Sequence, residues 1–343
     1  AAERITAARL REDLYFISSD EMAGRDTPSP GLDETARFIA ARLAKLKLKP
    51  AGDDKTYFQR IALRSFKVDP EGTKAQVAGR AYKFGQDFLA GTANGQAAGP
   101  LVYVGHGYRI DSKNINAYRG VDVRDKIVVT AAGVLPPGVA RGELKGEAGG
   151  EWDNAASYAR RNGARGLIQI PKNFERYWRF GRFRANRDSF QVERFQDQEA
   201  DSLPTITPSA EMINALFANE KWGGEEILKS IVAGGPGEAF DLAADKAVSF
   251  QVSAVSKTAT TQNVVAVLEG RDSQLKKEYV AVGAHYDHVG TGAPDKNGDR
   301  IYNGADDDGS GTVAVLAMAE AFARGPRPKR SILFVWHAAE EKG

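Results

Sequence analysis

The sequence predicts an α/β protein in which a mostly parallel sheet, with helices on both faces, is interrupted by a β-rich insert. Strands and a helix alternate over residues 250–343. Within that range residues 279–284 form an almost continuously apolar run, which is typical of a strand covered on both faces. From about residue 90 to about residue 240 the chain instead has short apolar runs separated by many glycines, which indicates a different domain.

The chain is long enough for more than one domain, because 343 residues exceed what one ordinary core buries. We expect residues 1–90 to begin a main domain, residues 91–245 to form the insert, and residues 246–343 to return to the main domain. The last range shows too few covered strands for a complete sheet of this kind. The main domain is therefore expected to be incomplete at the C-terminal end of the sequence.

The N-terminal region, residues 1–48, is expected to be helical. Ser29 and Pro30, followed by acidic residues, are typical of a helix start, because proline fits the first turn and acids favour the N-terminal end of the dipole. The side chains of Ile39, Leu43 and Leu46 follow at helical spacing and predict one buried stripe. A strand is expected over residues 57–68.

The insert and the C-terminal region are expected to differ in the arrangement of their strands and helices. In the insert, the short apolar runs predict strands over 101–104, 126–129 and 166–170, with a helix over 152–161. In the C-terminal region we expect strands over 264–268, 279–284 and 331–336, a polar glycine-rich loop over 290–311 and a helix over 312–322. The strand–helix–strand order there implies a parallel sheet.

The composition excludes several kinds of site and partner. Apolar residues make up 42% and charged residues 27% of the chain, as in a globular protein, and the net charge of +2 gives no electrostatic case for a nucleic-acid or membrane partner. No apolar run approaches the roughly 18 residues that span a bilayer. With no cysteine, any transition metal must be held by His, Asp or Glu.

Three polar motifs follow predicted strands, at the ends where open α/β sheets place their sites. They are His285-Tyr286-Asp287, the acidic loop Gly304–Gly311, and the pair Glu340-Glu341. An imidazole can bind a metal while the nearby carboxylate orients it. Three consecutive carboxylates repel one another and favour a cation, and of two adjacent glutamates one can bind the metal while the other takes a proton from metal-bound water.

Each motif is weak alone, but their order along one sheet predicts a metal-dependent site. Here the chain resembles the aminopeptidase Y family of co-catalytic di-zinc exopeptidases, through the runs 284–288, 304–311 and 337–343. The stretch Ser19–Arg25 is similar to the start of bacterial members. The resemblance implies that residues 1–90 and 246–343 are parts of a zinc-exopeptidase domain.

The insert is similar to a protease-associated domain. Residues 118–128 and 155–166 match its two most recognisable stretches. The resemblance therefore implies that residues 91–245 are a protease-associated insert, with no role that the sequence reveals.

The resemblance also implies roles for five residues. His285 would bind one zinc ion, Asp307 would bridge two, Glu341 would bind the second, Glu340 would be the general base, and Asp287 would hold the imidazole of His285. The function implied is zinc-dependent hydrolysis of N-terminal residues from peptides, with two zinc ions per complete peptidase domain. The family has a further Asp and a distal His ligand after the glutamate pair, which we expect beyond Gly343.

Other functions remain open at this point. They are a non-catalytic, receptor-like homologue on the same scaffold, a zinc glutaminyl cyclase, and a carboxypeptidase. The only partner expected is a peptide substrate, with no nucleic acid and no membrane span. The resemblance implies a periplasmic or secreted mature chain without its signal peptide.

Some polar residues have simpler interpretations. His288 and His337 match no ligand position and are expected to be loop or supporting residues, and His106 is expected to be structural. The Arg- and aromatic-rich segment 160–194 is typical of single-stranded nucleic-acid binding, but a surface element of the insert is favoured. Residues 295–299 are expected to form a solvated turn rather than a calcium loop.

Overall fold

The computed structural model describes residues 4–185, 187–194, 202–244, 246 and 248–342, and Gly343 lies outside them. The chain forms two compact units. Unit 1 comprises Ala1–Arg64, Phe190–Glu193 and Thr258–Gly343, and unit 2 comprises Ser65–Ser189 and Arg194–Lys257. Unit 2 includes residues on both sides of the predicted insert, 91–245, and these include strands that pair within unit 2. The long strands β2 (Phe58–Val68) and β17 (Ala254–Leu268) each contribute residues to both units.

The predicted α/β class is confirmed, and unit 1 shows how it arises. Its sheet has the order β13-β2-β17-β19-β18, with β1 paired to β17. The remaining strands are β1 (Lys49–Pro50), β13 (Ser189–Val192), β18 (Tyr279–His285) and β19 (Ser331–His337). Strands β18 and β19 are parallel, as the strand–helix–strand order predicted, whereas β17 runs antiparallel to β19. The described part of this sheet is therefore mixed.

The helices of unit 1 are α1 (Ala7–Ile17), α2 (Pro30–Lys45) and α7 (Ser310–Ala323). Helix α2 begins as predicted, because the Ser29 side chain accepts a hydrogen bond from the backbone of Leu32 and Pro30 occupies the first turn. Ile39 and Leu43 are fully buried, while Leu46 at the end of the helix is half-buried. The predicted stripe thus covers the body of the helix.

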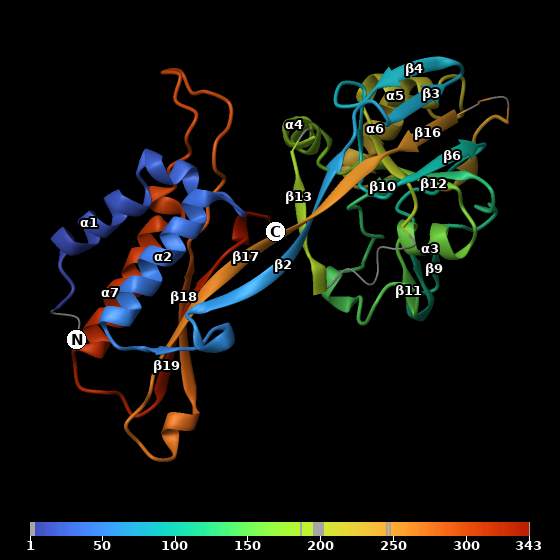
Figure 1. Ribbon diagram of the computed structural model, residues 1–343. Helices are drawn as coiled ribbons and strands as arrows, with labels where there is room; N and C mark the ends of the chain where they lie inside the picture. The colour runs from blue at the N-terminus through green and yellow to red at the C-terminus, as the bar shows by residue number, and fades with distance from the viewer. Residues whose placement is uncertain (1–3, 186, 195–201, 245, 247, 343) are drawn as a thin grey trace. The chain divides into compact units, whose positions relative to one another are not determined.

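Figure 1 shows these three helices together on one side of β17, β18 and β19. Ile332, Phe334 and Trp336 alternate along β19 and are buried in the core that α2 and α7 share. Strand β18 lies at the sheet edge and exposes Tyr279 and Val280. We expected helices on both faces, and among the described residues the cover lies on one.

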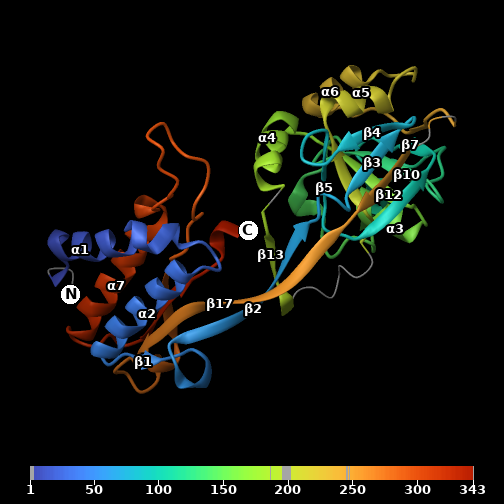
Figure 2. The same cartoon turned by 45° about the horizontal axis from the view of Figure 1, so that its top comes forward.

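Unit 2 contains a second, largely parallel sheet. Strands β7 (Leu101–Tyr103), β10 (Ile127–Ala132), β12 (Gly166–Pro171) and β14 (Thr205–Pro208) pair in parallel, with β15 (Phe240–Asp241) and β5 (Phe88–Ala90) antiparallel at its edges. Helix α3 (Ala155–Arg161) lies on one side of this sheet, and α5 (Ala210–Leu216) and α6 (Gly224–Ala233) lie on the other (Figure 2). Both faces are apolar, as in other covered parallel sheets.

Two smaller sheets complete the described part of unit 2. One is antiparallel, with the order β4-β3-β16-β6, and the other has the order β11-β8-β9. Their strands are β3 (Lys74–Val77), β4 (Arg80–Lys83), β6 (Gly95–Gly99), β8 (Arg109–Ile110), β9 (Ile115–Asn116), β11 (Trp152–Asp153) and β16 (Val248–Val252). Helix α4 (Phe174–Arg184) follows β12.

The predicted helix over 152–161 is wrong at its start. Trp152 pairs with Ile110 in β11, and the helix begins only at Ala155. The reason is Asn154, whose side chain accepts a hydrogen bond from the backbone of Ser157 and so caps α3.

No helix in the described ranges is long and apolar enough to cross a bilayer.

Candidate metal centre

The candidate donors follow strand ends that lie at one edge of the unit 1 sheet. His285 ends β18, and Glu340 and Glu341 follow β19 in the short 3₁₀ turn Glu340–Lys342. Strands β18 and β19 are parallel and pair His285 with His337. Their carboxyl ends therefore meet, as expected for sites of open α/β sheets.

Asp307 comes from the π-helical turn Ala305–Gly309, directly before α7. The neighbouring carboxylate of Asp308 accepts a hydrogen bond from the backbone of Gly311 at 3.0 Å and so caps the first turn of α7. The Asp307–Asp308 peptide bond is cis. Of these two acids, Asp307 lies beside the other candidate donors, whereas Asp308 caps helix α7.

The side chains predicted from the motifs lie close together. The Nε2 atom of His285 is 3.2 Å from Oδ1 of Asp307 and 4.0 Å from Oε2 of Glu340. The Nδ1 atom of His288 is 2.9 Å from Oε1 of Glu341. Asp307 also belongs to a group with His288 and Glu341, in which the three ligand atoms lie within 4.8 Å of one another. Asp307 is thus common to both sets of contacts.

His288 is the residue that the sequence interpretation placed outside the donor set. The structure places its ring against Glu341, and the ring fits there because residue 304 is a glycine. Gly304 has a φ of +60°, and a Cβ atom at this position would lie 2.6 Å from the His288 ring. The available sequence signal was that His288 follows Asp287 directly, in the run His-Tyr-Asp-His.

Asp287 is fully buried and connects the donor loops. One of its carboxylate oxygens accepts a hydrogen bond from the Thr27 hydroxyl at 3.0 Å, and the other accepts one from the backbone N–H of Glu340 at 3.3 Å. The Thr27 hydroxyl in turn accepts a bond from the backbone of Ala339. Asp287 therefore fixes the position of the segment that carries Glu340.

The contact between Asp287 and His285 is closer through the backbone than through the side chain. Nδ1 of His285 lies 3.2 Å from the carbonyl oxygen of Asp287 and 3.6 Å from its carboxylate. An imidazole whose Nδ1 donates to this carbonyl presents Nε2 with a free lone pair toward Asp307. That Asp287 holds His285 stays a prediction.

Arg25 is fully buried and ties the N-terminal segment to the loops around the centre. Its guanidinium donates to four backbone carbonyl oxygens, those of Ile17, Tyr286, Asn303 and Gly304, at 2.6 to 2.9 Å. These carbonyls belong to helix α1, to the residue after β18 and to the loop before Asp307. The stretch Ser19–Arg25 was noted in the sequence only for its similarity to a family. In the structure, Arg25 of this stretch holds the loops around the candidate centre together.

Burial lowers the pKa of Arg25 to about 10, and the nearby carboxylates of Asp287 and Asp308 oppose this change. The guanidinium therefore remains charged at neutral pH. It supplies a fixed positive charge beside the buried acid that positions the glutamate segment.

The two remaining histidines lie outside this donor set. The ring of His337 is 6.1 Å from that of His285, centroid to centroid, and its carbonyl accepts a bond from the backbone of Tyr286. His106 is in unit 2, where its Nδ1 accepts a hydrogen bond from the backbone of Tyr108. Burial lowers the pKa of His106, which favours this neutral form.

The chemistry of the donor set fits zinc. It consists of imidazole nitrogens and carboxylate oxygens, which are zinc ligands, and the chain has no cysteine that would add a thiolate. His285, His288, Asp307 and Glu341 can each offer one ligand atom. Glu340 lies beside them with its side chain 54% exposed, which leaves it accessible to a substrate.

Comparison with known proteins finds a family model that matches the C-terminal part of the chain. Residues 263–343 match the family model described as Peptidase family M28. This segment contains every candidate donor and Glu340. A comparison with curated proteins finds no match.

The chain is also similar to solved structures. An aminopeptidase from Aneurinibacillus sp. strain AM-1 has 17% identity and a TM-score of 0.55, over 99% of this chain and 64% of that one. A zinc aminopeptidase from Bacillus subtilis has 20% identity and a TM-score of 0.43, over 98% of this chain and 63% of that one. The first likeness supports the α/β fold. The chain spans less than two thirds of the length of either protein.

Proposed function

We propose that this chain is the catalytic chain of a zinc-dependent aminopeptidase, which removes N-terminal residues from peptides. The observation that carries the proposal is the meeting of His285, Asp307 and the Glu340–Glu341 pair at one sheet edge, within the segment that matches Peptidase family M28. The likeness to an aminopeptidase from Aneurinibacillus supports the same fold for such a site.

His285, Asp307 and Glu341 would hold zinc, with Asp307 shared between two ions in a complete domain. Asp307 is suited to this role, because it is the acid common to the contacts of His285 and to the group with His288 and Glu341. Zinc bound there would polarise the substrate carbonyl and lower the pKa of a water molecule.

Glu340 would act as the general base. Its carboxylate faces the donors, 4.0 Å from Nε2 of His285, and is exposed enough to meet a water molecule and a substrate. It would accept the proton of the attacking water and return it to the departing amine. Asp287, bonded to the backbone of Glu340, would keep this carboxylate in reach. We also propose that residues 91–245 form a protease-associated domain. The sequence resemblance also supports export of the protein to the periplasm or the medium.

The test combines metal analysis with a substrate panel on the full-length protein. The wild type should contain about two zinc ions per chain and cleave aminoacyl substrates with a free N-terminus, but not their N-acetylated forms. Glu340→Gln should keep the zinc and lose turnover by about 10³-fold. Full activity in this variant would end the assignment of the base.

The panel also separates the alternative functions. Cleavage of only N-blocked peptides from the C-terminal end would indicate a carboxypeptidase, and cyclisation of N-terminal Gln would indicate a glutaminyl cyclase. A protein without zinc and without any of these activities would indicate the receptor-like homologue.

A further inference from the structure

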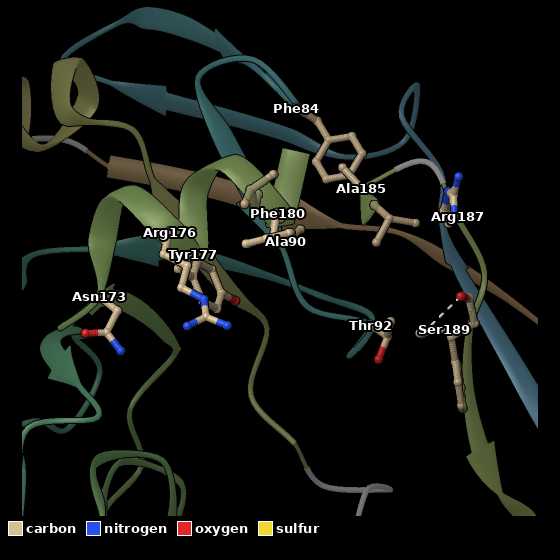
Figure 3. A pocket seen from close by; sticks show the side chains of 14 residues that line it. Phe84, Ala90, Thr92, Asn173, Arg176, Tyr177, Phe180, Ala185, Arg187 and Ser189 are labelled. Atoms are coloured by element: carbon tan, nitrogen blue, oxygen red, sulfur yellow. Dashed lines mark hydrogen bonds between the residues drawn. The ribbon is translucent and has the colours of Figure 1, made fainter. Parts of the chain in front are cut away.

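Unit 2 contains a cavity of about 590 Å³ beside helix α4. It lies between α4, the end of β2 and strand β5, and Figure 3 shows the side chains that line it. All of its lining residues fall between 66 and 189 and so belong to unit 2. Its volume is in the range of about 300–1,000 Å³ that is typical of small-molecule sites.

The cavity has an apolar floor. Its apolar lining residues are Phe66, Val68, Phe84, Leu89, Ala90, Phe180 and Ala185. Gly181 allows α4 to approach this floor, because a Cβ atom at residue 181 would lie 2.4 Å from a methyl carbon of Leu89. Phe180 is 48% exposed, so part of its ring is accessible to a ligand in the cavity. The floor is therefore suited to an apolar side chain.

Polar side chains line the two ends of the cavity. Figure 3 shows Asn173, Arg176 and Tyr177 at one end, and Thr92 near Ser189 at the other. Within the described part of the chain, the side chains of Asn173, Arg176, Tyr177 and Thr92 form no hydrogen bond or ion pair. These groups are therefore available to a ligand that has several hydrogen-bonding atoms.

The charge of the lining is positive. Arg176 and Arg187 are among the lining residues, and none of the described lining residues is an aspartate or glutamate. The guanidinium of Arg176 lies 5.8 Å from the centroid of the Phe180 ring, above the apolar floor. A planar guanidinium in this position suits a carboxylate, which it can bind through two parallel hydrogen bonds.

We propose that this cavity binds a short apolar peptide by its free C-terminal carboxylate. Arg176 binds the carboxylate, the floor around Phe84 and Leu89 takes the C-terminal side chain, and Asn173 and Thr92 bind the peptide amides. A fatty acid would use the floor and Arg176 but leave these polar side chains without partners. The site lies in unit 2 and does not depend on the proposed zinc centre.

The binding test uses N-acetyl-leucyl-phenylalanine and its C-terminal amide, measured by titration calorimetry on the zinc-loaded full chain. The acetyl group blocks cleavage from the N-terminus, and the amide removes only the charge. The acid should bind about tenfold more tightly than the amide. Arg176→Gln should reduce the affinity for the acid to that for the amide.

Arg179→Gln is the matched control. Arg179 lies on the same helix, and its guanidinium is 5.4 Å from the same Phe180 ring, but it does not line the cavity. This variant should bind the acid as the wild type does. Equal loss in both variants would overturn the proposal, since it would indicate only the general charge of α4, and so would equal binding of acid and amide by the wild type.

A second variant tests the floor. Ala90→Phe should fill the cavity and weaken both the acid and the amide at least tenfold, with an unchanged circular dichroism spectrum. If Ala90→Phe does not fold, the pair Arg176→Gln and Arg179→Gln still decides. Binding of octanoate as tight as that of the peptide would overturn the assignment to a peptide, as would tighter binding of a single-stranded oligonucleotide.

Discussion

The candidate metal centre of unit 1 and the cavity of unit 2 both collect polar side chains, but they hold them differently. In unit 1, Arg25 and Asp287 are fully buried and bonded to several backbone atoms. In unit 2, Arg176 and Asn173 lie on the wall of an open cavity without internal hydrogen bonds or ion pairs to described residues. The buried bonds of unit 1 hold the side chains near the candidate metal centre in place before a substrate binds, as a catalytic site requires. The cavity of unit 2 instead leaves its polar side chains available to a ligand.

The largest effect should come from Arg25→Met, which removes the buried guanidinium from unit 1. Four carbonyl oxygens would lose the guanidinium as a donor, and within the described residues only that of Gly304 keeps another donor, the backbone N–H of Gly309. Buried unpaired polar groups are costly. We expect the free energy of unfolding to fall by about 3 kcal/mol or more, measured by urea denaturation. Arg37→Met is the control, because among the described residues Arg37 forms only an exposed ion pair with Glu34. Equal stability of the two variants would contradict the role given to Arg25.

Asp287→Asn tests whether the buried acid positions the base. Thr27 and Glu340 donate to different oxygens of Asp287, and in asparagine one of these two positions becomes an NH2 group that cannot accept, so one of the two bonds is lost. We expect kcat to fall by about 10- to 100-fold with zinc still bound and KM little changed. Kinetics and metal analysis of the same preparation check this. A large rise in KM at unchanged kcat would place Asp287 in substrate binding instead.

His288→Ala tests the residue that only the structure brought into the donor set. Because His288 contacts Glu341 at 2.9 Å, its loss should weaken zinc affinity by about tenfold or more, measured by competition with a chromophoric chelator. His337→Ala is the matched variant, since the His337 ring is near His285 but outside the donor group. Equal zinc affinity in the two variants would return His288 to the loop role that the sequence suggested.

The smallest effect on stability should be that of Arg176→Gln in unit 2. Its side chain has no hydrogen bond or ion pair to a described residue, so the free energy of unfolding should change by less than about 0.5 kcal/mol. Urea denaturation beside Arg25→Met makes the comparison direct. A loss as large as that of Arg25→Met would show that the cavity wall is structural and would remove the contrast between the two regions.

Much of the local structure could be predicted from the sequence. The helix start at Ser29 and Pro30 and the strands that became β18 and β19 depend on neighbouring residues, so capping and apolar patterns were sufficient. The start of α3 was missed because the cap at Asn154 lies inside an otherwise helical pattern. The glycine-rich pattern used for the insert begins near residue 90, whereas unit 2 begins at Ser65, because β3 and β4 precede that point and pair in one sheet with β16 and β6.

The candidate metal centre also has a part that the sequence predicted and a part that it did not. The motifs by themselves determined that His285 and the Glu340–Glu341 pair follow strand ends and that Asp307 precedes a helix, and the parallel strands β18 and β19 then bring the strand ends together. Only the tertiary structure decided that His288 contacts Glu341 and that Arg25 is buried among carbonyl oxygens of Tyr286 and Gly304. The physical reason is that Arg25 and these partners are more than 250 positions apart in the chain. No local pattern tells a buried arginine from an exposed one, because its cost and its compensation both come from distant backbone.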